Sequence, residues 1–533
     1  MEQFLPLNLP AGLYANGTLY QAKGRWARAN LIRWLPDGSQ YPPLLPIGGW
    51  ALQQSSTGAE IDAVGFPRGT HAWRGNDASA WLAVATTGSG TTKAYAYTPS
   101  TLTDITPGGL VDGVADGAIS AGGATGWGSG GWGEGGWGGV GAAAGVLVDA
   151  DTWSLDNFGE KLLGCLTSDG KIWIWDKNIA NDFTQLTNAP TGCRAVVVTG
   201  ERFIMALGSS SNPRQVAWAS QETETTWAPA VTNSAGDFVL QTNGRLIAGK
   251  RTARETLLWT DADLWAAVYI GGPFIYRFDQ RGDGCGLLGP NAMAIVEGAA
   301  YWMSDGQFFR YDGAVRQLPC EVADYVFGDF NKSQKAKIAA FANAAFGEVW
   351  WFYPSASQSG TENDRYVAYN YRGGFWMTGT LGRAAGVGAG VFAQPMCWDS
   401  AGKLYAHEVG QDRGGENAYI ESGPIELGSG DRTLTFQKLI PDDLPIGQVE
   451  ATFFASFQPH QAEQTYGPYA LTAETDIRWS GRQVRVRFEQ VGDLDVFADG
   501  SFLADGSLLA GPVGTVDFRL GTMRLGIIPG SRR

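Results

Sequence analysis

Short aromatic strands separated by tight turns dominate the chain between about residues 60 and 410. The strands are four to six residues long and rich in β-branched and aromatic side chains, as in Lys171–Trp175, Ala299–Met303 and Glu348–Tyr353. Glycine, at 75 of 533 residues, supplies the turns, and aromatic residues make up 12%. Disordered chains lack aromatics and collagen needs glycine at every third position, so both classes are excluded. The pattern predicts an all-β fold.

A turn followed by a strand of alternating apolar residues occurs three times, in Ser168–Asp176, Ser304–Asp312 and Asp399–His407. The copies lie roughly two or three units of 45 to 50 residues apart, which is the size of a four-stranded propeller blade. The span from 60 to 410 then holds about seven blades. The alternative is a set of ordinary hairpins in two sandwiches.

Longer strands follow residue 417 and predict a separate β-sandwich. We therefore predict an all-β protein with a β-propeller-like platform and an additional C-terminal β-sandwich-like domain. The predicted units are an extended N-terminal segment packing on the platform (1–59), the propeller-like domain (60–416) and a C-terminal β-rich domain (417–533). One helix is expected at Asn331–Asn343, because this stretch lacks glycine and proline; its lysines at 332, 335 and 337 are expected to form a solvated face.

A glycine-rich loop is expected at 122–145, where Trp127, Trp132 and Trp137 follow one another at a period of five, each between two glycines. Glycine this dense disfavours a regular strand or helix. The loop is either a flexible surface loop or an arm whose tryptophans anchor in a neighbouring subunit. These three tryptophans are the candidate subunit-contact or gating residues.

No catalytic motif is present. The three histidines, His71, His407 and His460, are far apart and have no ligand-spaced neighbours, and there is no GxSxG turn, P-loop or GxGxxG after a strand. Ser220–Trp227 resembles an imperfect Asp-box, which is a folding device between propeller strands. The pairs Asp149-x-Asp151 and Asp261-x-Asp263 lack the rest of a calcium loop and predict turns. We expect no enzyme activity, no cofactor and no metal site.

The net charge and the cysteines limit the binding partners and the cellular compartment that the sequence predicts. The net charge of −14 disfavours binding of nucleic acid over the whole surface. It permits a transient encounter with DNA, because an acidic channel wall would repel the phosphates and let the DNA slide. Five cysteines without metal spacing predict buried thiols made in a reducing cytosol. No signal peptide and no transmembrane helix are predicted.

Several segments taken together resemble the virion tail proteins of tailed bacteriophages. They are Gly12–Thr18, Gly24–Trp26, Leu31–Arg33, Gly48–Trp50, the Gly-Trp-Gly run, Asn157–Glu160, Tyr405–Glu408, Ile420–Gly423, Gly430–Arg432, Pro441–Asp442, Tyr466–Tyr469, Ser480–Arg485 and Arg519–Leu525 through Pro529–Gly530. Their order is similar to that of the tail nozzle (tail tubular protein B-like) family of short-tailed phages. The chain departs from the family by an insertion at roughly Asp499–Gly511.

The resemblance implies a structural virion protein. It would form a homohexameric ring below the portal and adaptor, continue the DNA channel, and retain and then release the genome. It implies assembly in the host cytoplasm, a place in the phage tail, and contact with the adaptor and with tail fibre or other tail proteins. Double-stranded DNA would pass without sequence-specific binding. The loops at 122–145 and 492–514 are both candidates for the gate. The alternatives are a propeller-type glycan-binding (receptor-binding) tail protein, whose exposed tryptophans stack on sugar rings, and a glycan hydrolase.

Overall fold

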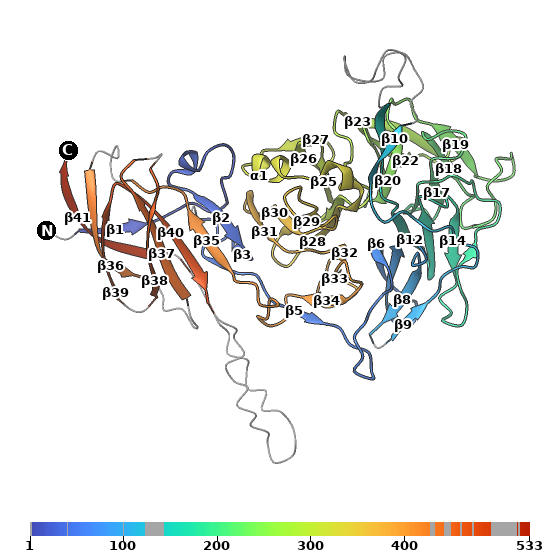
Figure 1. Ribbon diagram of the computed structural model, residues 1–533. Helices are drawn as coiled ribbons and strands as arrows, with labels where there is room; N and C mark the ends of the chain where they lie inside the picture. The colour runs from blue at the N-terminus through green and yellow to red at the C-terminus, as the bar shows by residue number, and fades with distance from the viewer. Residues whose placement is uncertain are drawn as a thin grey trace, which may run out of the picture.

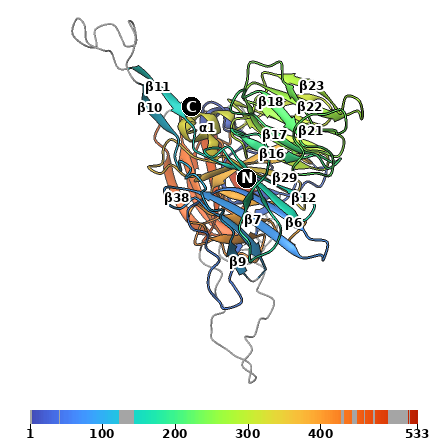
Figure 2. The same ribbon diagram turned by 90° about the vertical axis from the view of Figure 1, so that its right-hand side faces the viewer.

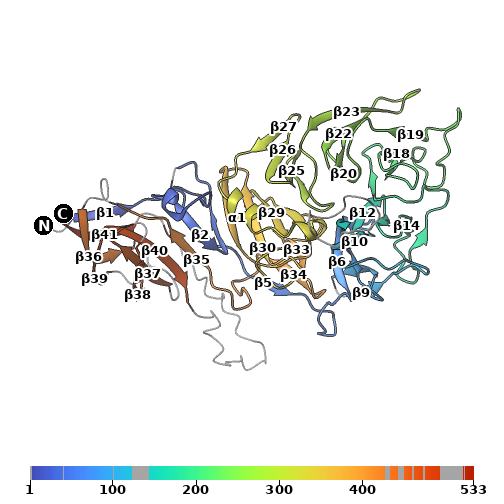
Figure 3. The same ribbon diagram turned by 45° about the horizontal axis from the view of Figure 1, so that its top comes forward.

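The molecule is an elongated pair of β domains, a propeller and a sandwich, with both chain termini at the far end of the sandwich (Figures 1 and 3). The structure is a computed structural model, and it describes residues 3–39, 41–99, 101–122, 143–426, 432–441, 449–458, 461–471, 474–491, 520 and 523–532. None of the helices in these ranges has the length and apolar character needed to span a bilayer.

Seven four-stranded antiparallel sheets within these ranges form the blades of the propeller, so the predicted all-β propeller fold is confirmed. The blades, from inner to outer strand, are β6 to β9 (Phe66–Arg74, Ala80–Thr87, Ala94–Thr98, Thr101–Asp104), β12 to β15 (Trp153–Phe158, Lys161–Leu166, Ile172–Trp175, Thr184–Gln185), β16 to β19 (Ala195–Val198, Ile204–Leu207, Gln215–Trp218, Gly236–Val239), β20 to β23 (Leu246–Arg251, Thr256–Thr260, Asp263–Tyr269, Tyr276–Asp283), β24 to β27 (Met293–Val296, Ala299–Ser304, Gln307–Tyr311, Val315–Leu318), β28 to β31 (Ala339–Asn343, Glu348–Tyr353, Arg365–Asn370, Phe375–Thr380) and β32 to β34 (Ala385–Val387, Met396–Trp398, Leu404–His407) with β5 (Trp50–Leu52).

In four of the seven blades the inner strand carries mostly small side chains. The inner strands β16, β24, β28 and β32 consist largely of alanine, valine and glycine, because seven strands crowd together at the axis. Further out, where neighbouring blades diverge, the middle strands carry fully buried tryptophans, among them Trp175, Trp259, Trp302 and Trp351. The backbones of the inner strands β20 and β24 lie farther apart than those of the other neighbouring inner strands.

The three sequence repeats occupy equivalent places. They contain β14, β26 and β34, each of which is the third strand of its blade. The repeat is therefore confirmed as a blade repeat. The last blade is completed by β5 from the N-terminal segment, whose residues 50–52 pair with β34.

The second domain is a sandwich of two sheets. One sheet has the order β1 (Gln3–Leu7), β41 (Met523–Arg532), β36 (Arg432–Ile440), β39 (Thr475–Gly481), and the other β2 (Trp26–Asn30), β35 (Tyr419–Ser422), β40 (Gln483–Gln490), β37 (Val449–Ser456), β38 (Gln464–Ala470). Trp479 of the first sheet stacks on Phe436 at 4.1 Å and meets Phe453 of the second sheet at 5.1 Å. The predicted additional β-sandwich is confirmed, and its strands β1 and β2 come from the N-terminal segment that was expected to pack on the platform.

The remaining elements connect or extend these sheets. They are η1 (Leu19–Ala22), β3 (Ile32–Trp34) paired with β4 (Leu44–Pro46), the hairpin β10 (Ala118–Gly122) and β11 (Ala143–Val148), α1 (Ala323–Gly328) and η2 (Lys332–Lys337). Figure 2 shows the hairpin projecting from the propeller. The loop that carries Trp127, Trp132 and Trp137 leaves this hairpin and lies outside the described residues.

The helix expected at Asn331–Asn343 is wrong. The 3-10 turn η2 covers its first half, and β28, the inner strand of a blade, covers Ala339–Asn343. Tertiary pairing with β29 overrides the helix propensity of the alanines. Lys337 does not join a solvated face either: it is buried, and its ammonium donates to Asp116 at 2.6 Å and to Glu362 at 2.8 Å.

The five cysteines are all free thiols, four of them buried and Cys320 half-buried. Burial raises the pKa of Cys193, Cys320 and Cys397 to about 12 and that of Cys285 to about 11. The thiolate is the reactive form, so these groups are protonated and inert at neutral pH.

We therefore expect native protein at pH 8 to react with a disulfide reagent such as 5,5′-dithiobis(2-nitrobenzoic acid) at essentially no thiol within minutes. After unfolding in guanidinium chloride, all five thiols should react. The absorbance of the released thiolate measures both. Rapid reaction of the native protein would contradict the burial described.

Candidate functional site

A buried charge cluster joins the N-terminal segment to two blades. Arg33 of β3 is 1% exposed and donates from Nε and Nη2 to the two oxygens of Glu348, both at 3.0 Å. Its Nη1 and Nη2 donate to Glu408 at 2.8 and 2.6 Å. Glu348 begins β29, and Glu408 directly follows β34. One guanidinium thus binds two carboxylates from different blades, each through two hydrogen bonds.

Burial and charge act against each other in this cluster: burial raises the pKa of Glu348, and the charge of Arg33 opposes that rise. Burial alone would lower the pKa of Arg33, but the charges of Glu348 and Glu408 outweigh it and raise that pKa above its ordinary value. The ring of Phe346 packs against the guanidinium at 3.7 Å. Asn343 donates a further hydrogen bond to Glu408 at 2.9 Å. The remaining lone pairs are therefore partly satisfied, which a buried ion pair needs in order to be tolerated.

Two glycines let the chain pass beside this cluster into the propeller. Gly48 donates its backbone N–H to Glu408 at 3.0 Å, and a Cβ on Gly48 would come within 2.7 Å of the Glu408 Cα. A Cβ on Gly49 would meet the backbone O and N of Asp412 at 2.3 and 2.6 Å. Directly after them, Trp50 stacks on His407 at 5.7 Å. Only glycine allows the two strands to approach this closely.

The same region contacts the sandwich. Arg413, also buried, donates from Nε and Nη2 to the backbone oxygen of Ile47 at 2.9 and 2.6 Å, and from Nη1 to Gln490 of β40 at 3.3 Å. Burial lowers the pKa of Arg413 to about 10. We call the set Arg33, Ile47, Gly48, Gly49, Glu348, Glu408, Arg413 and Gln490 the joint, because it ties the N-terminal segment to both domains.

Three segments singled out in the sequence meet at the joint. Leu31–Arg33 supplies the guanidinium, Tyr405–Glu408 supplies the second carboxylate, and Gly48–Trp50 passes between them and pairs with β34. A fourth, Ile420–Gly423, lies on β35, where it pairs with β2. The partner Glu348 was missed by sequence reasoning, since nothing marks it among the other acids of the chain.

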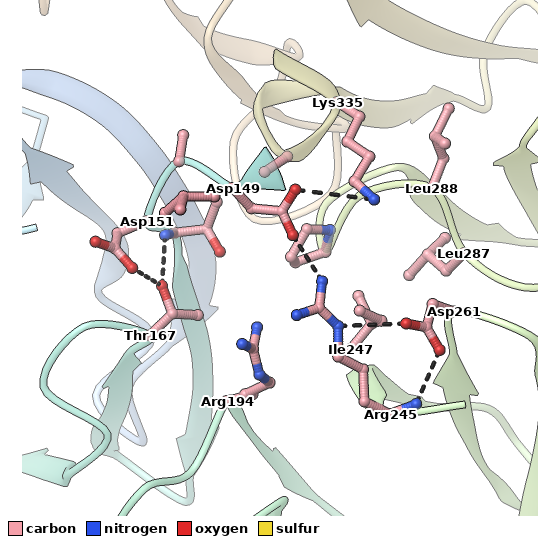
Figure 4. A pocket seen from close by; sticks show the side chains of 15 residues that line it. Asp149, Asp151, Thr167, Arg194, Arg245, Ile247, Asp261, Leu287, Leu288 and Lys335 are labelled. Carbon is pink, nitrogen blue, oxygen red and sulfur yellow. Dashed lines mark hydrogen bonds and ion pairs between the residues drawn. The ribbon is translucent and has the colours of Figure 1, made fainter. Parts of the chain in front are cut away.

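A second polar site lies at one end of the propeller axis (Figure 4). It is a cavity of about 280 Å³ between the blades that contain β12, β16 and β20, with a wall from η2. Arg245 donates to Asp149 at 2.7 Å and forms an ion pair with Asp261 at 3.3 Å, while Lys335 lies 3.8 Å from Asp149. Asp151 accepts from Thr167 at 2.7 Å and from the backbone of Val114 at 2.8 Å.

The aspartates of the two D-x-D pairs therefore converge across more than one hundred residues of sequence. One cavity is lined by Asp149, Asp151 and Asp261. Asp263 of β22 is buried instead, and its backbone N–H donates to the hydroxyl of Thr260. Their negative charge is balanced by Arg194, Arg245 and Lys335. Figure 4 shows Arg194 pointing into the cavity, where burial and then the nearby charge of Arg245 lower its pKa. A constant spacing from blade to blade could have paired these residues in the sequence. The blades differ in length, so the spacing is not constant.

The imperfect Asp-box, Ser220–Trp227, lies between β18 and β19 of one blade. The Ser220 N–H donates to the Thr226 carbonyl at 2.8 Å, and the buried Trp227 indole donates to the Glu224 carbonyl at 2.8 Å. The segment therefore lies between two strands of one blade, as predicted, and its role as a folding device stays a prediction. Across the part of the chain that the structure describes, no group of three or more His, Cys, Asp and Glu side chains is placed to hold a metal ion.

The fold and these sites define a seven-bladed propeller protein with an appended β-sandwich. No protein-family model matches the chain, and no curated protein matches it. Among solved structures it is similar to a streptogramin B lyase (9% identity, 67% of this chain and 96% of that chain, TM-score 0.39). It is similar also to a fungal alcohol oxidase of the AA5 family in complex with copper (11%, 83% and 92%, 0.40) and to virginiamycin B lyase from Staphylococcus aureus (7%, 66% and 96%, 0.32). Likeness at this level carries no argument about chemistry.

Proposed function

We propose that this protein is a structural subunit of a phage tail nozzle. The observation that carries the proposal is the joint: three of the segments that resemble the nozzle family lie far apart in the sequence and come into contact there. Residues of a catalytic site would surround an open cavity. These instead close the propeller and fasten it to the sandwich, as a subunit under mechanical load requires.

The continuity of the core supports the same role. One buried apolar cluster extends from Trp351 and Met293 of the propeller through Trp34 to Phe436 and Phe453 of the sandwich. The N-terminal segment adds hydrogen bonds along the outer face, such as Leu13 N–H to the Trp376 carbonyl at 3.0 Å and Leu31 N–H to the Tyr366 hydroxyl at 2.9 Å. A core shared between the two domains in this way resists their separation, which suits a ring that holds a packaged genome.

The remaining parts of the proposal concern the assembly. Six copies would form a homohexameric ring below the portal and adaptor, in contact with tail fibre or other tail proteins, in virions assembled in the host cytoplasm. Double-stranded DNA would pass through the ring without sequence-specific binding, and the net charge of −14 favours its passage over its retention on the wall. The subunit would have no catalytic activity of its own.

The test is the native mass of the purified protein, measured by native mass spectrometry, together with negative-stain images of purified virions. The expected result is a six-fold ring on the tail axis, bearing the protein by immunogold labelling. Peripheral copies on the side of the tail, or trimers, would contradict the proposal. The protein alone is compared with the protein mixed with its adaptor, because closed rings of this kind form by repeated contact between neighbours.

A second candidate function, glycan binding by a receptor-binding tail protein, is favoured by exposed aromatics at the outer edge of two blades. Phe274 is 75% exposed, and Tyr269 and Phe238 are about two-fifths exposed. Phe238 of β19 stacks on Phe278 of β23 at 4.8 Å with the rings nearly parallel. Flat aromatic faces of this kind stack on sugar rings. A glycan array would show saturable binding, and Phe274→Ala would reduce it, if this candidate holds.

A further inference from the structure

The opposite end of the propeller axis holds a second depression of quite different character. It has a volume of about 400 Å³ and is lined by residues from six of the seven inner strands of the described propeller, β16 being the exception. It adjoins a smaller, more enclosed space of about 130 Å³, with which it shares His71, Lys250 and Met293. The two spaces together run from the mouth into the axis of the propeller.

Two cations face this depression without an ion pair. Lys250 and Arg251 end β20, and neither side chain has a hydrogen-bond or ion-pair partner within the described residues. Lys250 is half-buried, and its ammonium forms no ion pair with a carboxylate of the described residues. In a chain with 53 acids and 39 basic residues, such a pair of uncompensated cations is unexpected.

The one acid of the lining does not neutralise them. Asp156 of β12 accepts backbone hydrogen bonds from Val198 at 2.8 Å and from Asn157 at 2.9 Å, and its carboxylate lies 3.8 Å from Nε2 of His71. His71 in turn contacts Asn157 at 2.9 Å. Burial lowers the pKa of His71; the charge of Asp156 opposes this effect, and the charges of Lys250 and Arg251 add to it. The imidazole therefore lies within electrostatic reach of both cations and of Asp156.

The facing wall is apolar. Met293 and Ile295 of β24, Phe341 of β28 and Val387 of β32 line it. A ligand that satisfied both walls would carry a negative head group at one end and an apolar body at the other. An inorganic anion would leave water on the apolar wall. A neutral apolar molecule would leave the two cations without a counter-charge.

We propose that this mouth of the propeller is a binding site for an organic anion with an apolar body, whose carboxylate or phosphate head group pairs with Lys250 and Arg251. The head group would form charge-assisted hydrogen bonds with the ammonium and guanidinium, and His71 would lie beside it. The chain of the ligand would replace water on Met293, Ile295, Phe341 and Val387. This inference stands apart from the nozzle proposal, since it concerns the axis of one subunit and not the axis of a ring.

The test is isothermal titration calorimetry of the full chain with octanoate, octyl phosphate and, as the oppositely charged control, octyltrimethylammonium. The expected result is saturable one-to-one binding of at least one of the two anions and no binding of the cation. Tighter binding of octanoate would identify a carboxylate head group, and tighter binding of octyl phosphate a phosphate one. Equal binding of the ammonium compound, or no binding of either anion, would overturn the proposal.

Variants locate the site. Lys250→Met and Arg251→Met should each weaken anion binding roughly tenfold, the value of one hydrogen bond to a charged group. Lys332→Met is the matched control, because Lys332 is exposed and paired with Asp305 at 3.0 Å; it should leave the affinity unchanged. Both test variants remove an unpaired charge and should fold, which their thermal unfolding checks. Unchanged affinity in both folded variants would refute the assignment.

A second readout does not depend on substitution. Saturating anion should move the ring resonances of His71 in the nuclear magnetic resonance spectrum more than those of His407. His407 is the internal comparison because it is buried, does not line the depression and accepts a hydrogen bond from Arg383 at 2.9 Å, although its ring meets Phe341 of the apolar wall at 6.4 Å. Movement of His407 with His71 unaffected would show that the anion binds elsewhere.

Discussion

Replacing Arg33 with methionine is expected to reduce the free energy of unfolding by about 3–5 kcal/mol, the cost of removing one partner from a buried ion pair. The variant would leave Glu348, which is fully buried, beside Glu408 with no cation between them. Two neighbouring carboxylates in a poorly solvated site repel each other, and at least one must take up a proton or reach water. Guanidinium chloride unfolding followed by tryptophan fluorescence measures the loss.

Arg28→Met is the matched control for this experiment. Arg28 lies five residues away in the same segment, is 61% exposed and reaches Glu421 only at 3.8 Å, so its loss should change stability by less than about 1 kcal/mol. Adding Glu348→Gln and Glu408→Gln to Arg33→Met should restore part of the lost stability, because no uncompensated charge remains. If Arg33→Met and Arg28→Met unfold at the same denaturant concentration, the cluster does not stabilise the joint.

Replacing Gly49 with alanine is expected to destabilise the protein by at least about 3 kcal/mol, the upper end of the range for overpacking. The added methyl group would overlap the backbone of Asp412, which cannot move away as a flexible side chain could. Backbone hydrogen bonds on both sides hold this crossing: Gly49 N–H to the Gly410 carbonyl at 3.0 Å and Trp50 N–H to the Asp412 carbonyl at 2.9 Å. Relief of the overlap would pull β5 away from β34 and open the last blade.

Limited proteolysis is the direct measurement, since an opened blade exposes the chain between Trp50 and Leu52 to cleavage. Gly360→Ala provides the comparison: Gly360 has no neighbouring atom within 4 Å of an added Cβ and should tolerate it. Equal resistance of the two variants to proteolysis would mean that the strand crossing can widen without loss of the blade.

Local pattern was enough to predict the blades. Runs such as Ile172–Trp175 and Gln307–Tyr311 carry their own strand preference and turn residues, and hairpins between consecutive strands need no distant information. The three sequence repeats also identified equivalent strands, because each repeat is a local turn followed by a strand. The seven-fold arrangement followed from the spacing of these units along the chain.

Pairings between distant segments could not be predicted in this way. Residues 50–52 fall in the segment predicted to be extended, and nothing in them specifies β34 as the partner. At Ala339–Asn343 the local preference for helix was overruled by pairing with β29. The charged sites failed for a related reason: Arg33 with Glu348, and Asp149 with Arg245, are combinations among 39 basic and 53 acidic residues that only the fold selects.

The pairing of the first strands with the last has a consequence for how the protein is made. β5 has no partner until Leu404–His407 has left the ribosome, β2 must wait for Tyr419–Ser422, and β1 for Met523–Arg532. At translation rates of roughly 5–20 residues per second, the first strands remain unpaired for on the order of a minute. Blades built only from consecutive strands can fold during that time, whereas the propeller closes only after residue 407 and the sandwich only after β41 has been made. A chain terminated before residue 404 therefore has neither domain closed, and one terminated between the two points has a closed propeller beside an incomplete sandwich.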